Sequence, residues 1–304
     1  MKNKKIVIIP TFCDSHLIQY QIDNLIDTIN PEYIVYNEGI FPRGPESNTN
    51  VNENFLKTYT LDGKRGFDFN ELEEIIESKQ KQYPQTNIIL NKMDYPLNMW
   101  DAPSCATYAC TNFNEVGIDI KEGDYIFPLE GDVFHHQDSK EEIEGYLSQL
   151  KPNTGFRSIW LDFMETQFYV EKKTTPPLYN GGEGGRQRKV CVRFGGMEFL
   201  KGVLSNFMTQ QYLMLYPTDL ITYHYPWWKP GKFKELRYAL INREKQYWEY
   251  FEKSLQTIKN NKNKIKEDVI LRPNLPDDRQ TKYASYIEIE HPHHIKNHPN
   301  YIKI

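Results

Sequence analysis

The sequence predicts an α/β fold in which a mostly parallel, twisted sheet is flanked by helices. Short apolar runs alternate with longer segments whose apolar residues recur at helical spacing. Strands that alternate with helices need crossover connections, which produce parallel pairing and cover both faces of the sheet. The chain of 304 residues is long enough for one large domain with an appended segment. We therefore expect one domain over residues 1–232, followed by a long helix and a surface-wrapping tail over residues 233–304.

The first half of the chain contains the clearest elements. Short apolar runs predict buried strands at residues 6–10, 33–36, 87–90 and 124–129. Helical spacing and capping residues predict helices at residues 16–29 and 102–116, and helices that begin near Asn70 and Ser139. Parallel α/β sheets bind ligands beyond the carboxyl ends of their strands. The residues that follow each strand are therefore the first candidates for a functional site.

The second half is less regular. Strands are expected at residues 156–160, 190–194 and 220–223, and a long helix at residues 234–266. The basic, glycine-rich residues 180–189 predict either a lid over a bound donor or a solvated connection. Four histidines in the tail are expected to face solvent, as such tracts usually do: His291, His293, His294 and His298.

The composition narrows the classes of partner. A formal charge of −4 and a pI near 6.1 disfavour a dedicated duplex-DNA binder, although a local basic patch would still permit DNA contact. The four cysteines show neither metal-ligand nor disulfide-framework spacing, which favours free thiols in a reducing compartment. The apolar run at residues 6–9 is too short for a signal peptide core or a membrane span. We expect no membrane span and a cytoplasmic location, in the host cytoplasm if the protein is viral.

A pair of carboxylates follows the fourth predicted strand. Glu130 and Asp132 are separated by Gly131, and a turn at a strand end can rotate both side chains toward one hard cation such as Mg²⁺ or Mn²⁺. Such an ion would neutralise charge that develops on a diphosphate leaving group. The competing interpretation is an acidic turn that caps the following helix. The spacing alone leaves both interpretations open.

A histidine follows the last predicted strand. His224 lies among aromatic residues and precedes Lys229 and Lys232. A neutral imidazole can complete a metal shell, and lysine side chains can bind phosphate oxygens. The aromatic residues would then stack on a sugar or a base. Alternatively, they close the core over the sheet edge and His224 is structural.

The order of these features resembles the GT-A type glycosyltransferases, in particular their inverting, family 2-like members. The resemblance runs from residue 5 to residue 235, and the segments that carry it are residues 6–12, 33–39, 101–112 and 123–132, with His224 as the late histidine. Residues 37–46 and 224–232 are similar to uncharacterised phage and environmental members. The chain departs from the family in three ways. Glu130 replaces an aspartate, the helix before it lacks the usual arginine, and residues 37–39 lack the usual two acids.

The resemblance also implies roles for single residues. The implied ligands of Mn²⁺ or Mg²⁺ are Glu130, Asp132 and His224. The implied contacts to a nucleotide-sugar donor are Pro10, Thr11, Asn37, Glu38 and Asp101, and the basic Arg186, Lys229 and Lys232 would meet its phosphates. An inverting transfer needs a carboxylate to take the proton of the acceptor hydroxyl, and the candidates are Glu165, Asp162 and Glu183. Strand alternation places Glu165 and Asp162 on opposite faces, so at most one of them faces the cleft. Alternatively, neither does, and both are surface acids.

Together these expectations predict a metal-dependent glycosyltransferase that moves a sugar from a nucleotide-diphosphate donor to a hydroxyl acceptor. The acceptor would be a glycan or a hydroxymethylated base in phage DNA, and the acidic net charge argues against the second. A nucleotidyltransferase on a similar scaffold would use the same acids. A non-catalytic carbohydrate-binding protein would use the aromatic residues without a metal. Fold analogy favours the enzyme, but the site has to carry the function.

Overall fold

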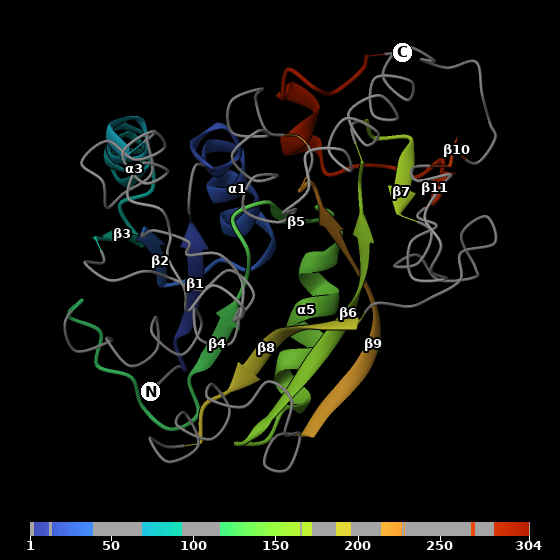
Figure 1. Cartoon of the computed structure of the whole chain (residues 1–304). Helices are drawn as coiled ribbons and strands as arrows, with labels where there is room; N and C mark the ends of the chain where they lie inside the picture. Colours follow the sequence, from blue (N-terminus) through green and yellow to red (C-terminus); the bar gives the residue numbers. More distant parts are fainter. Residues whose placement is uncertain are drawn as a thin grey trace, which may run out of the picture.

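A computed structural model describes residues 3–11, 14–38, 69–92, 116–164, 166–171, 187–195, 214–226, 228, 269–270 and 283–303. The body of this part of the chain is an eight-stranded sheet with helices packed against it (Figure 1). The α/β fold class expected from the sequence, with a GT-A-like sheet and flanking helices, is confirmed. The long helix expected at residues 234–266 lies outside the described residues.

The large sheet has the strand order β3-β2-β1-β4-β8-β6-β9-β5. Its strands are β1 (Lys5–Thr11), β2 (Tyr33–Glu38), β3 (Asn87–Lys92), β4 (Tyr125–Pro128), β5 (Val133–His135), β6 (Thr154–Asp162), β8 (Gln187–Arg193) and β9 (Met214–His224). Only β8 and β5 pair antiparallel with their neighbours, so β1, β2, β3, β4, β6 and β9 all run in one direction. The carboxyl ends of these six strands therefore lie along one edge of the sheet. A small sheet, in the order β10-β11-β7, joins Val269–Ile270, Tyr283–Tyr286 and Tyr169–Glu171.

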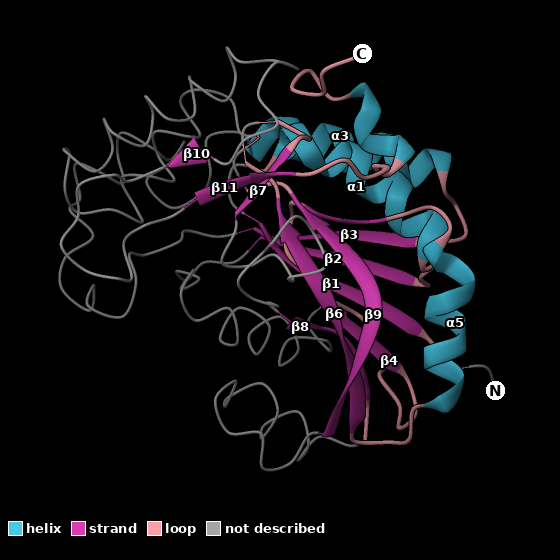
Figure 2. Ribbon diagram, turned by 90° about the vertical axis from the view of Figure 1, so that its right-hand side faces the viewer, coloured by secondary structure: helices cyan, strands magenta, loops and turns pink. Residues whose placement is uncertain are grey.

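Helices α1 (Ser15–Thr28), α3 (Phe69–Gln82) and α5 (Ser139–Gln149) lie along the same face of the sheet, as Figure 2 shows. Strand β1 accounts for this layering, because side chains alternate between the faces of a strand. Val7 and Ile9 pack in the core beneath these helices, whereas Ile6 and Ile8 belong to a separate apolar cluster. All four side chains are fully buried, as expected for a central parallel strand.

The two predicted helix caps are misplaced. Helix α3 already begins at Phe69, so Asn70 lies inside it, and α5 has Asp138 rather than Ser139 at its N-cap. Asp14 is the N-cap of α1, but its side chain makes no capping hydrogen bond. The carboxylate of Asp14 lies instead beside Gly131, where a Cβ on that glycine would meet it. Capping patterns locate a helix start within a residue or so, but tertiary contacts decide where each side chain points.

The histidines of the tail are buried, which corrects the expectation that they face solvent. His291, His294 and His298 are 3%, 7% and 5% exposed, and only His293 of the four lies at the surface. Their neighbours explain this burial. His291 meets the Tyr225 hydroxyl at 2.8 Å, His294 meets α1, and His298 stacks near Trp228. The segment containing the 3-10 helix η2 (His293–Asn297) is therefore part of the core.

None of the helices described in the structure is long and apolar enough to cross a membrane.

Candidate metal centre

The carboxyl edge of the large sheet gathers the polar residues that follow its strands. They are Thr11 at the end of β1, Glu38 at the end of β2, Glu130 after β4, Asp162 at the end of β6 and His224 at the end of β9. Asp132 lies in the turn between β4 and β5. The parallel direction of these strands brings their ends to one edge, which is where α/β sheets bind ligands.

His224 lies at the centre of this group and is buried. Its Nε2 atom is 3.1 Å from Oδ1 of Asp132 and 3.3 Å from Oε2 of Glu130. On the other side of the ring, Nδ1 is 2.5 Å from Oδ1 of Asp162. Among the residues that the structure describes, Nε2 has no hydrogen-bond partner, although a carboxylate oxygen of each acid lies within 3.3 Å of it. Nε2 therefore faces both carboxylates, as it would if all three side chains bound one metal ion.

Strand pairing sets this geometry. Asp162 and His224 are register partners on the parallel strands β6 and β9, and Val133 is the partner of His224 on β5. Two backbone hydrogen bonds extend the ladder past the strand ends: Tyr225 donates to the carbonyl of Asp132 at 2.9 Å, and Phe163 donates to that of His224 at 2.7 Å. The backbone positions of the acids and the histidine are therefore fixed by the sheet itself.

Helix α1 holds the turn that carries the acids. Gln21 is fully buried, and its amide nitrogen donates to the carbonyls of Glu130 (2.7 Å) and Val133 (3.0 Å). Its amide oxygen accepts from the Tyr36 hydroxyl at 3.2 Å. One turn further along α1, Asn24 accepts from the backbone N–H of His135 at 2.9 Å and donates to its carbonyl at 2.7 Å. These side chains satisfy backbone groups of β5, the edge strand of the sheet.

Gly131 allows a close approach between the turn and the start of α1. A Cβ at this position would lie 3.1 Å from Oδ2 of Asp14 and 3.3 Å from its Cβ and Cγ atoms. The glycine between the two acids therefore leaves room for a third carboxylate beside them. No local sequence pattern assigns a role in the site to Asp14, Gln21 or Tyr36. The available signal was that polar Gln21 and Asn24 lie one turn apart among the apolar residues of a buried helix.

The electrostatics of the group are those of a cation site. Burial would lower the pKa of the His224 imidazole, but the charges of Asp132 and Asp162 outweigh burial and raise the pKa to about 10. The metal-free protein thus places a positive charge among carboxylates, because buried carboxylates need such compensation. A divalent cation would supply the same kind of charge.

The donor set fits Mn²⁺ or Mg²⁺. Glu130, Asp132 and His224 each offer one ligand atom, and these atoms lie within 4.8 Å of one another. Carboxylate oxygens suit Mg²⁺ and Mn²⁺, and an imidazole nitrogen moves the preference toward the transition metal. The carboxylate of Glu130 is the more open of the two, with 32% of its side chain exposed. One side of the group is therefore accessible to a substrate.

The remaining predicted site residues fall into two sets. Asn37 and Glu38 are fully buried at the end of β2, and Thr11 is fully buried at the end of β1. Within the described part of the chain, the Thr11 hydroxyl has no hydrogen-bond partner, and Asn37 accepts from the amide of Asn91 at 2.8 Å. Pro10 precedes Thr11 in the same strand. The residues that lie outside the described part are Asp101, Glu165, Glu183, Arg186, Lys229 and Lys232.

Asp162, one of the candidates for the catalytic base, is buried beside His224. Its carboxylate accepts from Nδ1 of His224, and its side chain is only 4% exposed. Its candidacy as the catalytic base stays a prediction, and the structure places it against His224.

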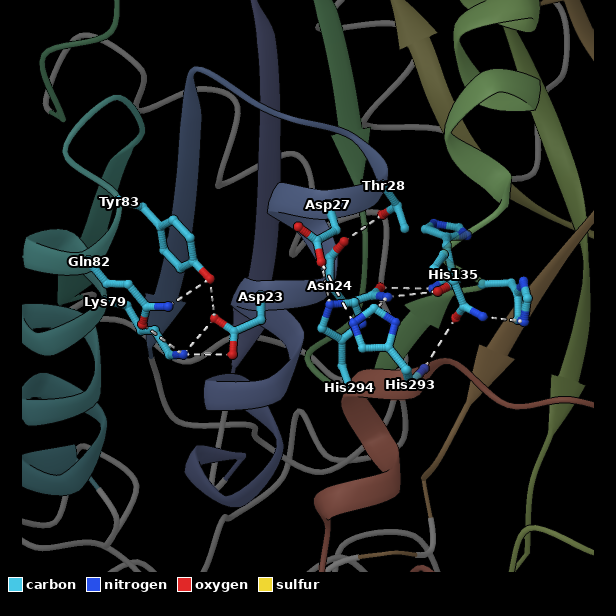
Figure 3. Close-up of polar contacts among 12 residues, drawn as sticks. Asp23, Asn24, Asp27, Thr28, Lys79, Gln82, Tyr83, His135, His293 and His294 are labelled. Carbon is cyan, nitrogen blue, oxygen red and sulfur yellow. Dashed lines mark hydrogen bonds and ion pairs between the residues drawn. The ribbon is translucent and has the colours of Figure 1, made fainter.

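A second group of ligand-type side chains lies between α1 and the tail (Figure 3). Asp27, His293 and His294 also bring one ligand atom each within 4.8 Å. Nε2 of His294 is 2.8 Å from Oδ2 of Asp27, and Nε2 of His293 is 3.8 Å from the same oxygen. The two imidazole rings lie 3.7 Å apart, centre to centre. Asn24 meets Nδ1 of His294 at 3.2 Å.

The chain has weak structural similarity to known proteins and no match at the level of sequence. No family model matches the chain, and no curated protein matches it. Among solved structures, TarS of S. aureus is similar at 9% identity and a TM-score of 0.34, over 86% of this chain and 44% of that one, so this chain spans less than half of that protein. TarS residues 1–349 in complex with UDP give 9% identity and a TM-score of 0.33, over 86% of this chain and 67% of that one. A putative glucose-1-phosphate thymidylyltransferase from Bacillus anthracis, in complex with a sucrose, has 9% sequence identity and a TM-score of 0.36. The match covers 81% of this chain and 98% of that one. Scores this low carry no functional argument, so the function has to be argued from the site.

Proposed function

We propose that the protein is a metal-dependent glycosyltransferase that moves a sugar from a nucleotide-diphosphate donor to a hydroxyl acceptor. The observation that carries the proposal is the convergence of Glu130, Asp132 and His224, from the ends of different strands, within 4.8 Å. They converge at the carboxyl edge of a largely parallel sheet, where such folds bind their ligands.

The three side chains would hold Mn²⁺ or Mg²⁺, which when bound supplies positive charge opposite a diphosphate leaving group. Asp132 is buried and fixed by the backbone bond from Tyr225, so it suits a permanent ligand. Glu130 is partly exposed and lies on the side from which a donor would approach. Gln21 keeps both residues in place by binding the backbone of their turn.

The donor would occupy the adjoining ends of β1 and β2. Thr11, Asn37 and Glu38 offer buried polar atoms there, and Pro10 shapes the end of β1. Buried polar groups that converge at a strand edge are suited to recognising a nucleoside. Further contacts to the donor are assigned, as part of the proposal, to Asp101, Arg186, Lys229 and Lys232. The proposed catalytic base is Glu165.

The direct test is a screen of nucleotide-sugars for Mn²⁺-dependent turnover, by hydrolysis or transfer. The wild-type protein is compared with Asp132→Asn and with Asp138→Asn. Asp138 is a control because its side chain is 84% exposed and lies 3.3 Å from the ring of His136, outside the proposed metal site. We expect turnover that depends on Mn²⁺, loss of at least about 100-fold in Asp132→Asn, and no change in the control. No turnover with any donor, together with donor binding that Asp132→Asn leaves intact, would rule the proposal out.

The same screen separates the competing functions. A nucleotidyltransferase would release diphosphate from a nucleoside triphosphate, whereas a sugar transferase would release a nucleoside diphosphate. A carbohydrate-binding protein would bind glycans equally well in the presence of a chelator. If the acceptor is a DNA base, binding to DNA should weaken steeply with salt, and a flat salt dependence excludes that acceptor.

A further inference from the structure

Each ring nitrogen of His224 faces at least one carboxylate. Nδ1 lies 2.5 Å from Asp162, and Nε2 faces Asp132 and Glu130. A carboxylate only accepts hydrogen bonds, so Nδ1 must carry a proton in every charge state of the ring. When the imidazole is neutral, the lone pair must therefore be on Nε2, the atom that faces the two acids.

We propose that Asp162 is a positioning residue, which locks His224 into the one tautomer that can bind a metal ion together with Glu130 and Asp132. This inference rests on the proposed metal site and assigns a role to a residue that was expected to be a base. A histidine that binds a metal commonly donates its other N–H to a carboxylate, which fixes the ring and increases its basicity. Asp162 is 3% exposed and is held opposite His224 by the register of β6 and β9.

In the Asp27–His293–His294 group, the proton of the neutral His294 ring lies on the opposite nitrogen from that of His224. The backbone N–H of His135 donates to Oδ1 of Asn24 at 2.9 Å, so the amide nitrogen of Asn24 is the atom that faces Nδ1 of His294. An amide nitrogen only donates, so Nδ1 of His294 carries the lone pair. The proton is then on Nε2, which donates it to Asp27 at 2.8 Å.

A metal ion could bind Nε2 of His294 only if the proton moved to Nδ1. There the N–H would face the N–H groups of the Asn24 amide, so that two donors would meet. The Asp27–His293–His294 group is thus set up as a hydrogen-bonded link between the tail and α1. The two groups differ in which ring nitrogen carries the proton when the ring is neutral. In His224 the neutral ring leaves the lone pair on Nε2, the nitrogen that faces the other ligand atoms, whereas in His294 it does not.

The test measures Mn²⁺ binding to the full chain without nucleotide, by electron paramagnetic resonance of free and bound ion. Asp162→Asn keeps the size of the side chain but lets an amide donate toward Nδ1, which permits the wrong tautomer. We expect its Mn²⁺ affinity to fall by about 10- to 100-fold. Electron spin-echo modulation from the His224 nitrogen, present in the wild type, should disappear in the variant. Asp27→Asn, the matched control in the second group, should change neither readout.

The outcomes separate this inference from the proposed function. A wild-type chain that does not bind Mn²⁺ at all contradicts the metal site and with it the proposed function. Nitrogen modulation and affinity that both persist in Asp162→Asn overturn the positioning role alone. Should the variant fail to fold, the ¹⁵N shifts of His224 in the wild type with Mg²⁺ decide instead, since a protonated Nε2 would overturn the inference.

Discussion

Asp162 and His224 are register partners on adjacent parallel strands, and Oδ1 of Asp162 lies 2.5 Å from Nδ1 of His224. The pairing of β6 with β9 therefore determines which nitrogen of His224 faces the acids that follow β4. A buried aspartate beneath a histidine is a device for fixing the ring rather than for taking a proton from substrate. The candidate metal centre is thus assembled by the sheet and by the helix that packs on its edge strand.

Metal binding should stabilise the folded protein. A ligand that binds only the folded state at about 100 times its dissociation constant adds about 2.7 kcal/mol to the free energy of unfolding. We expect Mn²⁺ to raise the melting temperature of the wild type and of Asp138→Asn, but not that of Asp132→Asn. Thermal unfolding followed by circular dichroism, with and without chelator, measures this. Equal shifts in all three proteins would mean that Mn²⁺ binds elsewhere.

Gln21→Leu should loosen the turn that carries the acids. It removes the partner of the Glu130 and Val133 carbonyls, and each unsatisfied buried polar group costs about 1–3 kcal/mol. We expect lower stability in urea unfolding and weaker Mn²⁺ binding.

Gln80→Leu is the control for that variant. Gln80 bridges backbone groups in the same way, since it accepts from Ile88 at 2.7 Å and donates to Thr86 at 2.9 Å. It should lose stability while its Mn²⁺ affinity stays at the wild-type value. If both variants weaken Mn²⁺ binding equally, the effect is general destabilisation and the special role of Gln21 is refuted.

A pair of glycine substitutions tests the close approach at the turn. Gly131→Ala would bring its Cβ to 3.1 Å from Oδ2 of Asp14, whereas at Gly145, inside α5, a Cβ meets nothing within 4 Å. We expect Gly131→Ala to cost about 1–3 kcal/mol through overpacking and to weaken Mn²⁺ binding. Gly145→Ala should gain roughly 0.5–1 kcal/mol and bind Mn²⁺ normally. A neutral Gly131→Ala would show that the contact with Asp14 is not tight.

The candidate metal ligands could be predicted from the sequence, but the residues that support them could not. Glu130, Asp132 and His224 could be found because each follows a short apolar run that reads as a strand. Asp162 was noticed, but its role depends on the register of β6 with β9, two strands far apart in the chain that no local pattern pairs. Gln21 sits in an apolar helix face, and its bonds to β5 depend on a three-residue strand too short to detect. The assignments of Glu165, Asp101, Arg186, Lys229 and Lys232 stay predictions.

The buried histidines of the tail should make the protein labile to acid. Burial lowers the pKa of His291 from 6.5 to about 3, and its ring is satisfied as a neutral group by Gln167 and Tyr225. Above pH 6.5 the imidazole of His291 is neutral in both the folded and the unfolded chain, so this residue does not reduce the stability of the folded state. As the pH falls from 6.5 toward about 3, the unfolded chain takes up a proton that the folded chain refuses.

In that pH window, His291 should therefore lower the free energy of unfolding by up to about 1.4 kcal/mol for each pH unit. His298 adds to the effect, because burial lowers its pKa to about 4. Urea unfolding at about pH 7 and about pH 5 measures the slope. His291→Gln should have a shallower slope than the wild type, even if it is less stable overall. An unchanged slope would mean that His291 does not titrate with unfolding.

The central claim is that Glu130, Asp132 and His224 hold the catalytic cation. Anomalous diffraction from crystals of the full chain grown with Mn²⁺ and a nucleoside diphosphate tests it most directly. The account predicts a peak among these three side chains, with the diphosphate next to it at the ends of β1 and β4. A peak at Asp27 and His294 with none at His224, or a bound nucleotide away from the carboxyl edge of the sheet, would contradict it.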